Sequence, residues 1–181
     1  MLFKLIIKCL EAIPYKGLFY IGKVLTLLLY ILPNKHKRIS KANLKLVFPH
    51  KTTLQINSIL RDSLFHSLMN ILEAGLVWGE RDYKKKPGFI DVKNFSEIEA
   101  GLSSDKGVLL FTPHIGNIEI IINFLGQHTD CTIPYTRPKN KDLDKIITNS
   151  RISSGVKMVD INVSGIKEML SALKNKKLVA V

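Results

Sequence analysis

The chain is poor in cysteine, with two among 181 residues. Cys9 lies in an apolar N-terminal stretch and Cys131 at the start of an expected strand, and the sequence has no CxxC pair or histidine-rich spacing typical of a metal site. We expect both cysteines to be buried, reduced thiols, and we expect no metal. A Walker loop and a GxGxxG motif are also missing from the sequence, so no nucleotide cofactor is indicated.

Acidic residues are scarce in the first fifty positions. This segment holds nine lysines or arginines against one acid, Glu11, a balance of +8 within a formal net charge of +12 for the chain. Such a segment favours an anionic partner, either a nucleic acid or a membrane surface. Because Leu, Ile, Val, Phe and Tyr crowd the stretch from Leu2 to Leu32, we expect an anionic membrane as the partner and no nucleic acid.

A long uninterrupted apolar run is also missing. The longest stretch, Gly17 to Leu32, has sixteen residues and is broken by Lys23, whereas a spanning helix needs about 20 apolar residues. We therefore favour an interfacial or re-entrant anchor over a single span, with a buried amphipathic helix of a soluble protein as the alternative. No small-residue cleavage site follows Leu32, which argues against a secretory signal, and the basic stretch from Pro33 to Arg38 indicates that the following chain is cytoplasmic.

The pattern divides the chain into a membrane anchor (1–33), a helical segment (34–86) and an α/β unit (87–181). The helical segment contains one long predicted helix, Thr53 to Gly79, capped by Thr52 or Thr53. From residue 89 the pattern alternates strand and helix, which predicts an α/β fold with a mostly parallel or mixed sheet. The predicted strands are 89–92, 107–112, 131–135, 156–160 and 178–181, and the predicted helices are 94–102, 118–126, 141–153 and 164–174.

One segment combines a strand end with two groups capable of proton transfer. Val108 to Phe111 is predicted to be a fully buried strand, and Gly116-Asn117 marks a turn before the next helix. His114 then follows the carboxyl end of the strand, and Glu119 lies in the first turn of the helix. A neutral imidazole next to a carboxylate can accept a proton from an attacking hydroxyl. We expect His114 and Glu119 to be catalytic, although a pair at this spacing is also common for purely structural reasons.

Basic side chains follow the next strand of the predicted sheet. Arg137 and Lys139 come directly after the strand that ends at Tyr135. Ligands of open α/β sheets bind at the carboxyl ends of the strands, where His114 also falls. We therefore expect these cations to reach the same crevice as His114.

The segment Thr112-Pro-His-Ile-Gly-Asn-Ile-Glu119 resembles a known signature. It is similar to the His-Phe-Gly-Asn-Trp-Glu form of the bacterial lipid A late acyltransferases, which belong to the wider lysophospholipid acyltransferase-like superfamily. Ile115 and Ile118 replace the usual aromatic residues, a difference that affects packing rather than the reacting groups.

Further blocks resemble the same family in the same order. The segment Arg38 to Pro49 is similar to its Arg…Asn-Leu…Phe-Pro block, and Tyr135 to Asn140 is similar to its Tyr-Arg-Pro…Asn block, with Thr136 as an extra or substituted residue. Asp144, Arg151 and Gly155 continue the second block. Members of the family extend beyond the position of Val181, so we expect a fragment of a longer product or a truncated form.

The resemblance implies transfer of a fatty acyl chain from an acyl carrier protein thioester, or from coenzyme A, to a hydroxyl of a lipid A precursor at the cytoplasmic face of the bacterial inner membrane. No cofactor other than the acyl donor is implied. The alternatives are an acyltransferase acting on another glycolipid or a lysophospholipid, and a truncated, non-catalytic, membrane-bound remnant.

The resemblance also assigns roles to single residues. His114 is expected to deprotonate the acceptor hydroxyl, and Glu119 is expected to orient its ring. Arg137 is expected to bind a phosphate of the substrate or of the carrier's phosphopantetheine, because a guanidinium group matches phosphate oxygens in two-point contact. The other substrate-binding candidates, which are expected to shape the turn or to fix the loop as much as to touch substrate, are Gly116, Asn117, Asn140 and Arg151.

Overall fold

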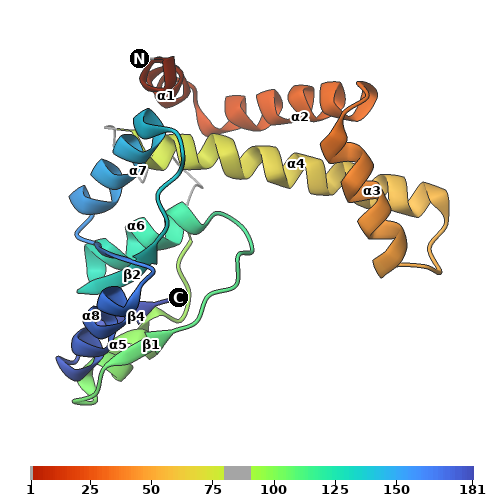
Figure 1. Cartoon of the computed structure of the whole chain (residues 1–181). Helices are drawn as coiled ribbons and strands as arrows, with labels where there is room; N and C mark the ends of the chain where they lie inside the picture. Colours follow the sequence, from red (N-terminus) through yellow and green to blue (C-terminus); the bar gives the residue numbers. More distant parts are fainter. Residues whose placement is uncertain (1, 80–90) are drawn as a thin grey trace.

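The computed structural model describes residues 2–79 and 91–181, and within them it has eight helices and one four-stranded parallel sheet. The N-terminal part is helical: α2 lies along α4, and α3 bends away from α2 and crosses α4, which it contacts (Figure 1). The boundary predicted at 86/87 lies outside the described residues. The N-terminal helices are α1 (Leu2–Ala12), α2 (Tyr15–Ile31), α3 (Lys35–Val47) and α4 (Thr53–Val77).

The apolar N-terminal segment forms two helices rather than one. Pro14 separates α1 from α2 and occupies the N-cap position of α2, where its missing N–H costs no intrahelical hydrogen bond. Within the described residues, no single helix is long and apolar enough to cross a membrane. Together α2 and α3 reach the required length and hydropathy, but the pair is bent by 82°.

The long packing helix α4 begins where the sequence predicts. Thr52 caps it by accepting a hydrogen bond from the backbone N–H of Gln55, and the Gln55 side chain accepts one in return from the backbone N–H of Thr52. This reciprocal pair is a capping box, which satisfies two backbone donors at the helix start. The helix ends at Val77, two residues before the predicted end.

The C-terminal part is the predicted α/β unit, and its sheet is parallel with the order β1-β4-β2-β3. Since neighbouring strands are parallel, their carboxyl ends lie at one edge of the sheet. The strands are β1 (Val108–Leu110), β2 (Cys131–Tyr135), β3 (Lys157–Asp160) and β4 (Leu178–Ala180). The helices are α5 (Phe95–Ser103), α6 (Ile118–His128), α7 (Lys141–Ser153) and α8 (Val163–Lys174).

The core of this unit lies between the sheet and α6. Leu178 and Ala180 of the central strand β4 are buried in one cluster with Ile122 and Leu125 of α6. Val179, between them, points to the opposite face of the sheet because side chains alternate along a strand, and it is 1% exposed. The helix α8 packs against strands β2, β3 and β4, and α6 in turn contacts α4, which joins the two parts of the molecule (Figure 1).

Two predictions about single segments are wrong, and a third is contradicted over the part that the structure describes. The strand around Val108 is not fully buried, because β1 is an edge strand, and Leu109 and Phe111 are 60% and 81% exposed. Of the strand predicted over 89–92, residues 89 and 90 lie outside the described residues, while 91 and 92 have no regular structure. Cys9 is exposed rather than buried, because the buried side of α1 is formed by Ile7 and Glu11, each two positions away.

Candidate functional site

A pocket of about 350 Å³ lies at the carboxyl edge of the sheet. Residues at or just beyond the ends of all four strands line it, together with the first turns of α6 and one side chain of α7. Its apolar lining comes mainly from α6 and from β2. The lining residues are Thr112, His114, Ile118, Ile121, Ile122, Leu125, Ile133, Pro134, Tyr135, Thr136, Arg151, Ile161, Ala180 and Val181.

His114 lies at the rim of this pocket, in the loop between β1 and α6. It is exposed to solvent. The loop is joined to β4 at its start, because the backbone N–H of Thr112 donates to the carbonyl oxygen of Val181 at 2.8 Å. The imidazole is therefore free to contact a ligand that enters the pocket from solvent.

The end of the loop is fixed by Gly116 and Asn117. Gly116 has φ of +75°, a left-handed conformation that glycine adopts without steric cost. Asn117 caps α6, because its side-chain oxygen accepts a hydrogen bond of 3.1 Å from the backbone N–H of Glu119. Its amide nitrogen donates to the carbonyl oxygen of Asn70 in α4 at 3.1 Å. Gly116 and Asn117 thus shape the turn, and Asn117 also holds it against the helical part.

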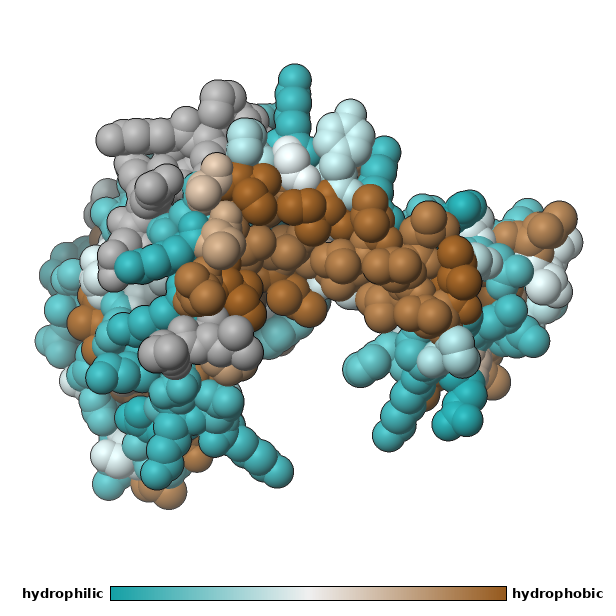
Figure 2. Space-filling view, turned by 90° about the horizontal axis from the view of Figure 1, so that it is seen from above, coloured by the Kyte–Doolittle hydropathy of each residue, from teal (hydrophilic) through white to brown (hydrophobic). Residues whose placement is uncertain are grey.

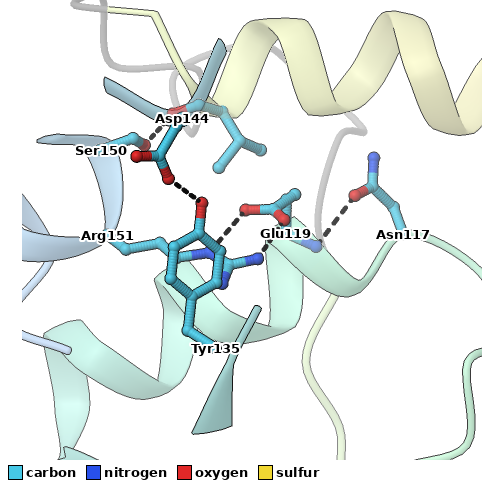
Figure 3. A network of polar contacts seen from close by, with 7 residues as sticks. Asn117, Glu119, Tyr135, Asp144, Ser150 and Arg151 are labelled. Carbon is cyan, nitrogen blue, oxygen red and sulfur yellow. Dashed lines mark hydrogen bonds and ion pairs between the residues drawn. The ribbon is translucent and has the colours of Figure 1, made fainter. Parts of the chain in front are cut away.

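Glu119 forms a buried ion pair with Arg151 (Figure 3). The Arg151 guanidinium donates to one carboxylate oxygen at 2.5 Å and to the other at 3.2 Å, and the two side chains are 11% and 10% exposed. Two-point contact of this kind orients a carboxylate as well as neutralising it. The acid of the predicted pair is therefore held rigidly by α7.

A second set of contacts fixes Arg151 itself. Its guanidinium lies 4.9 Å from the centre of the Tyr135 ring, a distance typical of a cation–π contact. The Tyr135 hydroxyl donates to Asp144 at 2.8 Å (Figure 3). Burial raises the pKa of Tyr135, and its hydrogen bond to Asp144 raises it further, so the hydroxyl stays protonated as a donor. The side chain of Ser150 ties α7 to α4 by donating to the carbonyl oxygen of Val77 at 3.0 Å.

The other predicted residues lie at the edge of this network. Arg137 pairs with Asp144 at 3.3 Å and keeps 64% of its side chain exposed. Asn140 caps α7, since its side-chain oxygen accepts a hydrogen bond from the backbone N–H of Leu143 at 3.0 Å. This contact gives Asn140 a role in fixing the loop.

The structure brings His114 and Arg151 to one pocket, with Glu119 paired to Arg151. Among the hydrogen bonds of the described residues, none joins His114 to Glu119. A carboxylate has about four acceptor positions, and Arg151 occupies one on each oxygen, so the ion pair leaves acceptor capacity for a further donor. Over residues 2–79 and 91–181, no group of three His, Cys, Asp or Glu side chains is arranged to hold a metal ion.

No role for Tyr135 or Asp144 is predicted from the sequence, although both lie in the block that carries the resemblance. The feature that indicates their contact is local: Tyr135 ends a strand, and Asp144 lies nine residues later in the first turn of the next helix. The pairing of Glu119 with Arg151 had no local signal, because 32 residues separate the two partners.

Comparison with known proteins identifies the family. The profile of the bacterial lipid A biosynthesis acyltransferases matches residues 1–181. The lipid A biosynthesis palmitoleoyltransferase of Escherichia coli K12 is 22% identical over 163 residues, which cover 90% of this chain and 52% of that protein. The lipid A biosynthesis acyltransferase of Haemophilus influenzae Rd is 26% identical over 174 residues, which cover 92% and 53%.

The chain spans about half the length of the curated relatives that it matches. The residues that the profile matches run from the first helix to the last strand and include those that line the pocket with His114 at its rim. The chain therefore belongs to the bacterial lipid A biosynthesis acyltransferase family.

Proposed function

We propose that the protein transfers a fatty acyl chain from an acyl carrier protein thioester to a hydroxyl of a lipid A precursor, at the cytoplasmic face of the inner membrane, with His114 as the general base. The observation that carries this proposal is the position of His114 at the rim of a largely apolar pocket at the carboxyl edge of the sheet. Family membership supports the reaction class.

The chemistry requires one proton carrier. A ring nitrogen of neutral His114 accepts the proton of the acceptor hydroxyl as its oxygen attacks the thioester carbonyl carbon. The tetrahedral intermediate then expels the thiolate, which takes the same proton back from the imidazolium. An ester bond forms, a thioester bond breaks, and the histidine returns to its neutral state.

Glu119 stabilises the imidazolium that forms during this cycle. Its carboxylate lies in the first turn of α6, five residues after the base, and Arg151 fixes its orientation through both oxygens. A remaining acceptor position on the carboxylate then serves the ring N–H of His114 when bound substrate turns the imidazole toward Glu119. Hydrogen bonds between catalytic groups are often long or unmade before substrate binds, and the exposed position of His114 fits such a movement.

The lining of the pocket suits an apolar chain. Four side chains of α6, together with Ile133 and Ala180 from the sheet, make the wall beyond the histidine. An acyl group held there would place its thioester carbonyl near the rim. Arg137, which is mostly exposed, is then the cation for a phosphate of the carrier's prosthetic group or of the lipid.

The experiment that tests this function is an acyl transfer assay with the product of the complete gene. The donor is offered as a carrier-protein thioester or as a coenzyme A thioester, and the acceptor is a lipid A precursor or a lysophospholipid. We expect acylation of the lipid A precursor, faster from the carrier protein. Acylation of the lysophospholipid alone would favour an enzyme for that acceptor, and no transfer from either donor would contradict the proposal.

A further inference from the structure

We propose that the outer face of α1 and α2 binds the surface of an anionic phospholipid bilayer, with α2 lying in the plane of the membrane rather than crossing it. This inference deepens the membrane association within the proposed function and rests on it. The lipid-facing stripe is defined by five exposed apolar residues of α2: Tyr20, Val24, Leu27, Leu28 and Ile31.

The stripe has the geometry of an amphipathic helix turned outward. Its five members recur at helical spacing, and their exposed fractions run from 49% for Leu28 to 66% for Tyr20. The opposite side of the helix, Leu18, Gly22 and Thr26, is buried and faces α4, where a Cβ on Gly22 would meet Met69. One side of α2 is therefore used for packing, and the other presents apolar side chains.

The apolar surface continues beyond α2. Figure 2 looks down on α1 and α2 and shows a broad hydrophobic strip across this side of the molecule, with hydrophilic side chains projecting at its margins. On α1, Leu5 and Ile6 are 61% and 46% exposed, and Leu32 extends the strip past the end of α2 at 56%. A contiguous apolar surface with a polar rim is typical of an interaction site.

The charge around the strip selects the partner. Residues 2–61 contain eleven lysines and arginines, and their one acid, Glu11, is buried. At the margin of the stripe, Lys23 lies 4.6 Å from the centre of the Phe19 ring, so its stem stays along the helix while its ammonium group remains exposed. At the turn into α3, Lys35 and Arg38 are exposed as well. Apolar side chains flanked by cations fit the acyl boundary and the anionic headgroups of a bilayer.

A second copy of the chain fits this face less well. Two such surfaces brought together would oppose their lysines without an exposed acid of residues 2–61 to pair them, and like charges in contact disfavour association. An anionic bilayer supplies the missing negative charge, so the charge pattern favours the bilayer over a dimer.

Helix length separates the in-plane arrangement from a span. The 17 residues of α2 extend about 26 Å, less than the roughly 30 Å of a hydrocarbon core. The chain then bends by 82° into α3, which carries several lysines. To cross the membrane, the chain would have to extend α2 into α3 and bury these lysines in the hydrocarbon core. A helix that lies in the interface requires neither.

Depth-dependent fluorescence quenching tests the arrangement. Tyr20→Trp, Leu27→Trp and Ile31→Trp are made singly in a Trp78→Phe background and bound to vesicles of phosphatidylcholine with phosphatidylglycerol, with quenchers at known depths. An in-plane helix predicts the same shallow depth at all three positions. A spanning helix predicts a difference of about 16 Å between positions 20 and 31, and such a gradient would overturn the inference while leaving membrane association intact.

Two variants check the surface and its charge. Leu28→Glu should lower vesicle binding at least tenfold, while Ile166→Glu, an exposed apolar position on α8, should bind as the unchanged chain does. Binding should fall with added salt and on vesicles of phosphatidylcholine alone. Equal binding of both variants, or dimers in light scattering without vesicle binding, would contradict the proposal.

Circular dichroism checks that each variant is folded. If Trp78→Phe does not fold, the quenching experiment uses bimane labels at the same three positions, in a chain with Cys9→Ser, in place of tryptophan. The acyl transfer assay in detergent, which needs no vesicle, separates failure of this inference from failure of the proposed function.

Discussion

The guanidinium of Arg151 donates one hydrogen bond to each oxygen of the Glu119 carboxylate, at 2.5 and 3.2 Å, and both side chains are nearly buried. The guanidinium carbon also lies 4.9 Å from the centre of the Tyr135 ring. This arrangement connects the first turn of α6, which follows the His114 loop, to the end of α7. The ion pair thus links the stability of the fold to the position of the Glu119 carboxylate, which is proposed to stabilise the His114 imidazolium.

Breaking this ion pair from one side should be costly. We expect Arg151→Ala to lower the free energy of unfolding by about 3 kcal/mol, because it leaves a buried carboxylate without a partner. The double variant Glu119→Gln/Arg151→Met should lose less than the sum of Arg151→Met and Glu119→Gln alone. Urea unfolding followed by circular dichroism measures the four variants and the unchanged chain, and strictly additive losses would show that the two groups do not act together.

The glycine of the His114 loop gives a second prediction. A Cβ at Gly116 would meet no atom within 4 Å, so its positive φ of +75° is the only constraint on the residue there. Gly116→Ala should cost about 1 kcal/mol of unfolding free energy, while Gly116→Asn should cost less, since asparagine tolerates this conformation. Thermal unfolding of the two variants makes the comparison. Equal losses would mean that the loop does not require the left-handed conformation.

Tyr15, the first residue of α2, should cause the free energy of unfolding to fall at high pH. The Tyr15 hydroxyl donates to Glu73 of α4 at 2.8 Å. Burial, followed by this hydrogen bond and the charge of Glu73, raises the pKa of Tyr15 from 10.0 to about 12. The folded chain therefore holds this proton more tightly than the unfolded chain does, and the contribution present below pH 10 is lost as the pH rises toward 12.

Replacing Tyr15 with phenylalanine tests this directly. The stability of Tyr15→Phe, measured by urea unfolding from pH 9 upward, should decline less steeply between pH 10 and 12 than that of the unchanged chain. Tyr20→Phe, at an exposed tyrosine of the same helix, is the matched control. Identical pH profiles for Tyr15→Phe and the unchanged chain would remove Tyr15 as the titrating group.

Filling the apolar pocket should change the preferred donor. Ile121 of α6 and Ile133 of β2 both line it. Ile121→Trp should favour shorter acyl donors by reducing the space beyond His114, whereas Ile161→Val, at the outer lining, should change the preference little. Competition between donors of different chain length in the transfer assay reports the ratio of kcat/KM values. An unchanged ratio in Ile121→Trp would place the acyl chain elsewhere.

Local signals in the sequence predicted much of the α/β unit. The bounds of the strand at Cys131–Tyr135 and of the helix at Lys141–Ser153 coincide with the prediction. In the structure the cap of this helix is Asn140, its neighbour in the sequence, so the helix start depends on local residues. Thr52 marks the start of α4 in the same way. Where capping and hydrophobic pattern agree, the element follows from its own residues.

Features that depend on distant parts of the chain could not be predicted. The exposure of Leu109 follows from the place of β1 at the sheet edge, which is set by the strand order and not by the apolar run itself. The sequence suggested Glu119 as a partner of His114 by proximity along the chain. Its partner in the fold is Arg151, which arrives from another helix.

The most direct test of the central claim is mass spectrometry of lipid A from a strain that lacks its own late acyltransferase. The strain is complemented with the complete gene, with its His114→Ala form or with its Glu119→Gln form. We expect lipid A to gain one acyl chain with the unchanged gene, to gain none detectable with His114→Ala, since a general base contributes roughly 100-fold or more, and to show an intermediate level with Glu119→Gln. A full gain with His114→Ala, at equal protein abundance in the membrane, would contradict the assignment of His114 as the base.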